Sequence, residues 1–171
     1  MYLPDAPPIQ LSRRVLTQKL VGDVRLVLQV AGRPTHDEIT QHIDEALRMA
    51  GSVRAVLVIA DGPDAAGPDA AQRARMARAG MLRVPTAVVT QSVLARRIMT
   101  AVSWIGGGSI RAFAPEQLHR AFEFLKISAP VRARIPAQLE ALRADLGALS
   151  IAPELSRPHA ADQVRILQTR G

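Results

Sequence analysis

Two short apolar runs, each followed by a helix-forming segment, constrain the fold of this 171-residue chain more than any other feature. Residues 53–60 (VRAVLVIA) and 84–90 (VPTAVVT) are mostly apolar, without a regular polar face. Strands with apolar residues on both faces belong to sheets that helices cover on both sides. Alternation of strands and helices indicates a largely parallel sheet. The chain is therefore expected to adopt an α/β fold.

An antiparallel hairpin is expected before this unit. Gly22 and Asp23 divide residues 11–30 into two β-rich runs, as a tight turn would. In the second run, apolar residues alternate with Arg25 and Gln29, which is the period of a strand. The hairpin should add two antiparallel strands at one side of the sheet.

Helices are expected at four places before residue 127. Thr35 and Glu38 have the spacing of a capping box, so a helix should begin there and end near Gly51. Two more should cover 69–79 and 115–126. Another helix is expected at residues 92–105. Its apolar residues should lie on one face: Leu94, Ile98, Ala101, Val102 and Ile105. With a short strand at 109–113, the predicted order is β-β-α-β-α-β-α-β-α.

The C-terminal part is expected to form an additional amphipathic helix. Its large aliphatic residues follow a 4, 3, 4, 3 spacing, which is a heptad-like seam: Ile135, Leu139, Leu142, Leu146 and Leu149. Such a seam must be buried, because each side chain contributes roughly 1.5–3 kcal/mol when it leaves water. It packs either on the chain's own sheet or on a second copy, and a homodimer is slightly favoured. The last twenty or so residues should be extended.

Three segments follow from this reading: an irregular arm (1–11), an α/β domain (12–127) and a helical extension with a tail (128–171). The chain has no cysteine and no apolar run long enough for a bilayer. The first ten residues lack the pattern of a signal peptide, so a cytoplasmic location is expected. The net charge is +7, but the arginines are scattered and aromatic residues make up 3%. Nucleic acid is therefore not the expected partner.

Two strings resemble a known family. Residues 88–113 (VVTQSVLARRIMTAVSWIGGGSIRAF) and 115–125 (PEQLHRAFEFL) are similar to the STAS fold of bacterial anti-sigma-factor antagonists, and most closely to its SpoIIAA-like (STAS/SEC14-like) branch. The resemblance covers roughly residues 12–127 and implies a regulatory module that binds a protein partner. In the antagonists, a serine after the third strand is phosphorylated. The corresponding stretch here, residues 60–67 (ADGPDAAG), has no hydroxyl, so that switch is missing.

No catalytic constellation is apparent in the sequence. Asp61 follows a predicted strand, but no acidic pair accompanies it as in a phospho-acceptor site with Mg²⁺. The four histidines have no metal-ligand spacing, and the glycine-rich phosphate motifs are missing. The chain is therefore expected to be no enzyme and to need no cofactor or metal.

The expected partner-binding surface combines the turn at 61–68, the helix after it and the helix at 92–104. Its candidate residues are Asp61, Asp64, Arg75, Arg78, Arg96, Arg97 and Trp104. The arginines either form a basic patch that docks an acidic protein surface or a lipid headgroup, or simply cover a solvated helix face. The alternative function is a carrier or sensor of a small apolar or lipid ligand, which the SEC14-like kinship implies. The side chains for it, equally suited to a plain core, are Met76, Met81, Met99, Trp104, Phe122 and Phe124.

Overall fold

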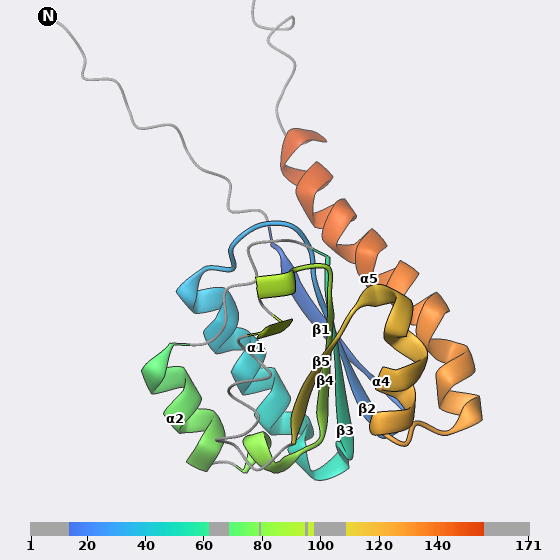
Figure 1. Cartoon of the computed structure of the whole chain (residues 1–171). Helices are drawn as coiled ribbons and strands as arrows, with labels where there is room; N and C mark the ends of the chain where they lie inside the picture. The colour runs from blue at the N-terminus through green and yellow to red at the C-terminus, as the bar shows by residue number, and fades with distance from the viewer. Residues whose placement is uncertain (1–13, 62–68, 79, 95, 98–108, 156–171) are drawn as a thin grey trace, which may run out of the picture.

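A computed structural model describes residues 14–61, 69–78, 80–94, 96–97 and 109–155, with side chains as far as residue 147. They contain one five-stranded sheet with the spatial order β1-β2-β3-β4-β5 (Figure 1). The first two strands are antiparallel, and all other neighbours are parallel. This confirms the predicted hairpin and parallel sheet. The strands are β1 (Leu16–Val21), β2 (Val24–Gln29), β3 (Ala55–Ala60), β4 (Thr86–Thr90) and β5 (Ile110–Phe113).

Helices cover both faces of the sheet (Figure 1). On one side lie α1 (His36–Met49) and α2 (Ala70–Arg78), and on the other lie α4 (Leu118–Phe124) and α5 (Ala129–Leu155). The helix expected to begin at Pro115 starts as a short 3₁₀ turn, Pro115–Gln117, before α4. The first residues of the expected extended tail, 152–155, are helical instead, because α5 continues to Leu155. The other predicted elements are confirmed in the described ranges, except the helix at 92–105, most of which lies outside the described residues.

Local signals in the sequence place the first turn and the first helix. Gly22 has φ +65°, a left-handed conformation that glycine adopts without strain. Thr35 Oγ1 accepts the N–H of Glu38 at 3.1 Å, as a cap should. The other half of the expected capping box, a hydrogen bond from the Thr35 N–H to the Glu38 side chain, is wrong. The Glu38 carboxylate instead accepts two N–H groups, from Val15 and Leu16, both at 2.7 Å, and so fastens α1 to the start of β1.

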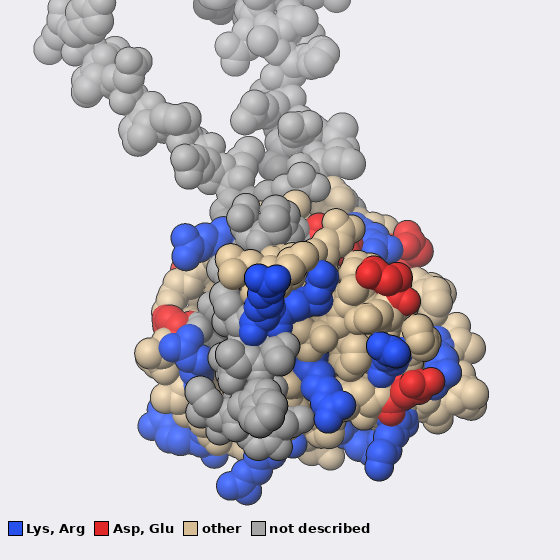
Figure 2. Space-filling model, in the orientation of Figure 1, with Lys and Arg blue, Asp and Glu red and all other residues tan. Residues whose placement is uncertain are grey.

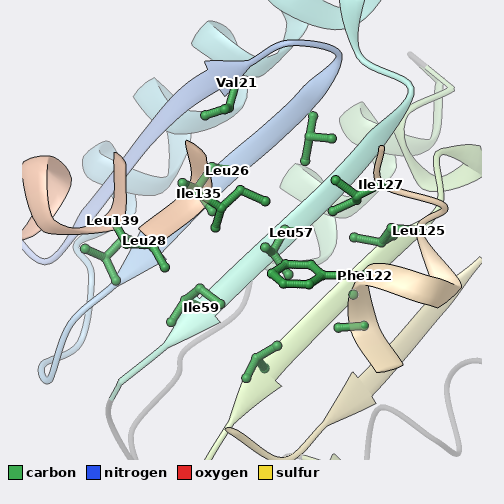
Figure 3. Packing of buried hydrophobic residues seen from close by; sticks show 14 of the residues in the cluster. Val21, Leu26, Leu28, Leu57, Ile59, Phe122, Leu125, Ile127, Ile135 and Leu139 are labelled. Atoms are coloured by element: carbon green, nitrogen blue, oxygen red, sulfur yellow. The ribbon is translucent and has the colours of Figure 1, made fainter. Parts of the chain in front are cut away.

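The face of the sheet beneath α4 and α5 is a closely packed apolar core (Figure 3). Alternate residues of β2 and β3 point into it, among them Leu26, Leu28 and Leu57, all fully buried. Phe122 and Leu125 reach it from α4 and the residue after α4, as Figure 3 shows. The cavities that border Arg25, described below, lie on the other face of the sheet.

The heptad-like seam of α5 is part of the same core. Ile135, Leu139, Leu142 and Leu146 are 0%, 8%, 3% and 2% exposed within the single chain. Figure 3 shows Ile135 and Leu139 beside Leu26 and Leu28 of β2. The preference for a seam between two chains is therefore corrected, because the sheet of the same chain already buries these side chains. The side chain of Leu149 lies outside the described residues.

Candidate functional site

The opposite face of the sheet, beneath α1 and α2, is packed differently. Its buried apolar cluster is small and consists of Leu16, Val27 and Val56, with partly buried residues around it. A cavity of about 240 Å³ lies against this face. Strands β1 to β5, helices α1 and α2, and the 3₁₀ turn Met81–Arg83 all contribute to its lining: Leu16, Arg25, Val27, Gln29, Ile39, His42, Ile43, Val56, Val58, Ala60, Met76, Met81, Leu82, Thr86, Val88 and Ile110.

Arg25 is the most unusual side chain in this cavity. It is 7% exposed, and its Nε is a buried donor that no acceptor in the described part of the chain reaches. No carboxylate of the described residues forms an ion pair with it. Burial lowers the pKa of Arg25 to about 10, so the guanidinium still carries its charge near pH 7. Burying a cation without a counter-charge lowers the stability of the fold, so such a residue is a candidate for a functional role.

His42 projects into the same cavity from α1 and is neutral near pH 7. Burial lowers the pKa of His42 to about 4, the nearby charge of Arg25 adds to this, and Glu45 opposes it. Gln18 of β1 fixes the surroundings by donating to the His42 carbonyl at 2.9 Å and to Glu45 Oε2 at 3.0 Å. Arg25 is therefore the one lining residue, within the described ranges, that is charged near pH 7.

Sequence reasoning missed Arg25 and Gln29 as site residues. Their alternation with apolar residues is typical of a strand with one solvent-exposed face, yet Arg25 and Gln29 are only 7% and 8% exposed. The signal that could have found them is the position of β2. A hairpin strand that also pairs with a central parallel strand lies between two helical layers, so its polar positions must be buried too.

Helix α2 is joined to α1 at the border of the cavity. Gln72, 6% exposed, donates from Nε2 to Thr40 Oγ1 at 3.1 Å and to the His36 carbonyl at 3.3 Å. Asp69 caps α2 by accepting the N–H of Gln72 at 2.8 Å, while Gln72 Oε1 accepts the N–H of Asp69. That cap, more than the neighbouring His36, lowers the pKa of Asp69. These bonds hold Met76, one helical turn later, in the cavity lining.

The predicted partner-binding residues are only partly brought together. Arg75 and Arg78 lie in the last turn of α2, and Arg75 pairs with Asp44 of α1. Asp61 directly follows β3 and accepts a hydrogen bond from Arg143 of α5 at 3.0 Å. This bond and a second one to Glu140 raise the pKa of Arg143. The candidates Asp64 and Trp104 lie outside the described residues.

A second group of residues lies where β3 and β4 end. Ala60 pairs with Thr90, so Asp61 and Gln91 leave the sheet at the same edge. Arg96 turns back to donate from Nη1 to the Thr90 carbonyl at 2.6 Å, whereas Arg97 is exposed.

The residues after β4 also expose apolar surface. Val93 and Leu94 are 54% and 69% exposed, so Leu94, expected on the apolar face of a helix, is open to solvent. The other expected members of that face lie outside the described residues: Ile98, Ala101, Val102 and Ile105. We refer to Asp61, Val93, Leu94 and Arg97 as the carboxyl-edge surface.

Charge on the visible face of the molecule is divided among several places. Figure 2 shows lysine and arginine side chains at separate positions rather than in one continuous patch. Within the described ranges, no three histidine or acidic side chains come together as metal ligands would. No described helix is both long enough and apolar enough to cross a membrane.

Comparison with known proteins gave one match. The model of a family described as SpoIIAA-like matches residues 25–126. No curated protein and no solved structure matched the chain significantly. The match covers β2 to α4 and therefore includes Arg25, His42 and the carboxyl-edge surface, whereas β1 and α5 lie outside it.

Proposed function

The chain belongs to the SpoIIAA-like family, and from this premise we propose that it is a non-catalytic regulatory or scaffold module that binds a protein partner. Membership of this family suggests a regulatory module of the STAS type, and such domains are generally non-catalytic. The mixed sheet with one antiparallel pair is consistent with that fold. The partner and the surface that binds it are our proposal.

The observation that carries the proposal is the exposed apolar pair at the carboxyl edge. Val93 and Leu94 are the large hydrophobic residues with high exposure in the described part of the chain. The exposed Arg97 lies one helical turn away. Interfaces commonly combine an apolar centre with arginine at or near it, and with a polar rim. The expected partner is therefore a protein surface that offers an apolar groove bordered by acidic side chains.

The turn after β3 distinguishes this chain from serine-switched antagonists. Residues 60–67 contain no serine, threonine or tyrosine. A phosphate at such a turn would add about −1.5 to −2 charges and change docking by repulsion and desolvation. Docking by this chain is therefore proposed to be independent of phosphorylation at that turn.

The test compares three immobilised proteins in the native cell lysate: the wild type, Leu94→Asp combined with Arg97→Glu, and Arg120→Glu. Arg120 is an exposed arginine on α4 and serves as the control for the charge reversal at Arg97. A partner that docks at the carboxyl edge is retained by the wild type and by Arg120→Glu but lost with the double variant. Equal retention by all three proteins would rule out this surface.

The alternative, a carrier or sensor of a small apolar ligand, has its own supporting observation. The cavity beneath α1 is lined by Met76 and Met81, two of the methionines expected for such a site. Phe122 belongs to the solid core beneath α4, and Phe124 packs against that core. Met99 and Trp104 lie outside the described residues.

A further inference from the structure

The cavity beneath α1 has the size and lining of a site for a small molecule. A cavity of about 150 Å³ holds benzene. By proportion, about 240 Å³ suits a ligand with on the order of ten heavy atoms. Most of the lining is aliphatic, from Val27, Val58 and Val88 on the sheet to Met76 and Met81 on the helical side. The flexible methionines can adapt to the shape of an apolar body.

The lining of this apolar space includes one positive charge that no carboxylate of the described residues neutralises. Arg25 lines the cavity with almost no exposure to solvent, and its Nε has no acceptor in the described part of the chain. A smaller cavity of about 120 Å³ also borders Arg25, together with apolar residues such as Ala46, Val53 and Val84. We propose that the larger cavity binds a small apolar carboxylate whose charged end pairs with Arg25.

The charge balance favours a carboxylate over a phosphate. Arg25 is the one cationic lining residue in the described ranges, and the other polar lining residues are Gln29, His42 and Thr86. A monoanion cancels a single guanidinium, whereas a dianionic phosphate would leave one negative charge uncompensated in a poorly solvated space. Guanidinium and carboxylate groups also match in shape, because two parallel hydrogen bonds can form between them.

The neighbouring polar groups are suited to a supporting role. Gln29 and His42 are uncharged near pH 7 and can complete the hydrogen bonds of a carboxylate oxygen that Arg25 does not reach. A neutral His42 also avoids a second positive charge beside Arg25. The ligand would thus supply the acceptor that the buried guanidinium lacks, and it would fill the aliphatic space with its body.

Calorimetry with the full chain at neutral pH tests the site, with octanoate as the probe and 1-octanol as its uncharged counterpart of equal length. A charged hydrogen bond is worth enough to make octanoate bind about 10- to 100-fold more tightly than octanol. Equal affinities, tighter binding of inorganic phosphate, or no binding of octanoate at millimolar concentration would overturn the proposal.

Two variants and one control locate the binding. Arg25→Met removes the charge at similar length and should lower octanoate affinity about 10- to 100-fold while leaving octanol affinity nearly unchanged. Val58→Phe fills the cavity and should weaken both ligands. Arg120→Met removes an exposed arginine on the other side of the sheet and should change neither. Unchanged octanoate binding by Arg25→Met would contradict the pairing.

A measurement on the unmodified protein covers the case in which a variant fails to fold. With ¹³C-methyl-labelled methionine, octanoate should shift the NMR signals of Met76 and Met81, which line the cavity. The signal of Met49 in α1, which does not line it, should stay in place. Shifts at Met49 without shifts at Met76 and Met81 would place the ligand elsewhere and refute the proposed site.

Discussion

The seam of α5 is predicted to stabilise the fold of the single chain, and Leu142→Ala measures this contribution. Leu142 is 3% exposed and belongs to the core beneath α4 and α5. The substitution removes roughly three buried methylene equivalents at about 0.8 kcal/mol each, or about 2.4 kcal/mol. The residual cavity raises the expected loss in the free energy of unfolding to about 3–4 kcal/mol.

Leu94→Ala is the matched control, because it makes the same chemical change at a residue that is 69% exposed. Its expected cost is below about 1 kcal/mol. Urea unfolding followed by circular dichroism, at two protein concentrations tenfold apart, measures both variants. If the two costs are equal, the buried position of the seam is refuted. A midpoint that rises with protein concentration would show that the seam stabilises a dimer instead.

Three further substitutions test other parts of the account by the same unfolding measurement. Gly22→Ala introduces a side chain at φ +65° and only 2.8 Å from α5, so it should cost at least about 1–2 kcal/mol, whereas Gly51→Ala, with open space around it, should cost nothing measurable. Glu38→Ala leaves the partly buried N–H groups of Val15 and Leu16, at the start of β1, without their acceptor and should cost about 2–4 kcal/mol. A loss below about 1 kcal/mol would mean that water replaces the carboxylate. The pKa of His42 is lowered from 6.5 to about 4 in the folded chain, so the unfolded chain takes up a proton first as the pH falls. The free energy of unfolding should therefore fall by on the order of 3 kcal/mol between pH 6.5 and pH 4. His42→Gln should remove this pH dependence, and an unchanged dependence would assign it to other groups.

Signals that act over a few residues were sufficient to predict much of the fold. The left-handed turn at Gly22 and the cap at Thr35 depend on neighbouring residues, and both occur as expected. The order of strands and helices follows from periodicity, which reports whether one face or both faces of an element must be buried. The family match over residues 25–126 agrees with this reading.

The errors concern contacts between distant parts of the chain. The 4, 3, 4, 3 spacing shows that the α5 seam must be covered, but it does not say whether the cover is the same chain or another. The Glu38 carboxylate accepts hydrogen bonds from Leu16 and Val15, 22 and 23 residues away, rather than from the adjacent helix cap. Arg25 looks like an outward-facing residue until α1 is placed over it.

The candidate site was therefore predicted less well than the fold. Asp61 directly follows β3 and Arg97 is exposed, but Arg75 is paired with Asp44, and Leu94, expected on an apolar helix face, is open to solvent. The sequence of a helix fixes how its residues are arranged around the helix axis. It does not say which face of the helix packs against the sheet. Only the assembled layers place the cavity beneath α1.

The central claim is that this module acts by docking through its carboxyl edge and not by chemistry. The most direct measurement is amide hydrogen exchange of the chain, alone and in complex with the protein that the wild type captures. The account predicts slower exchange at residues 91–97 on binding, with no change along α4. Protection confined to α4 and α5, with residues 91–97 unaffected, would contradict it.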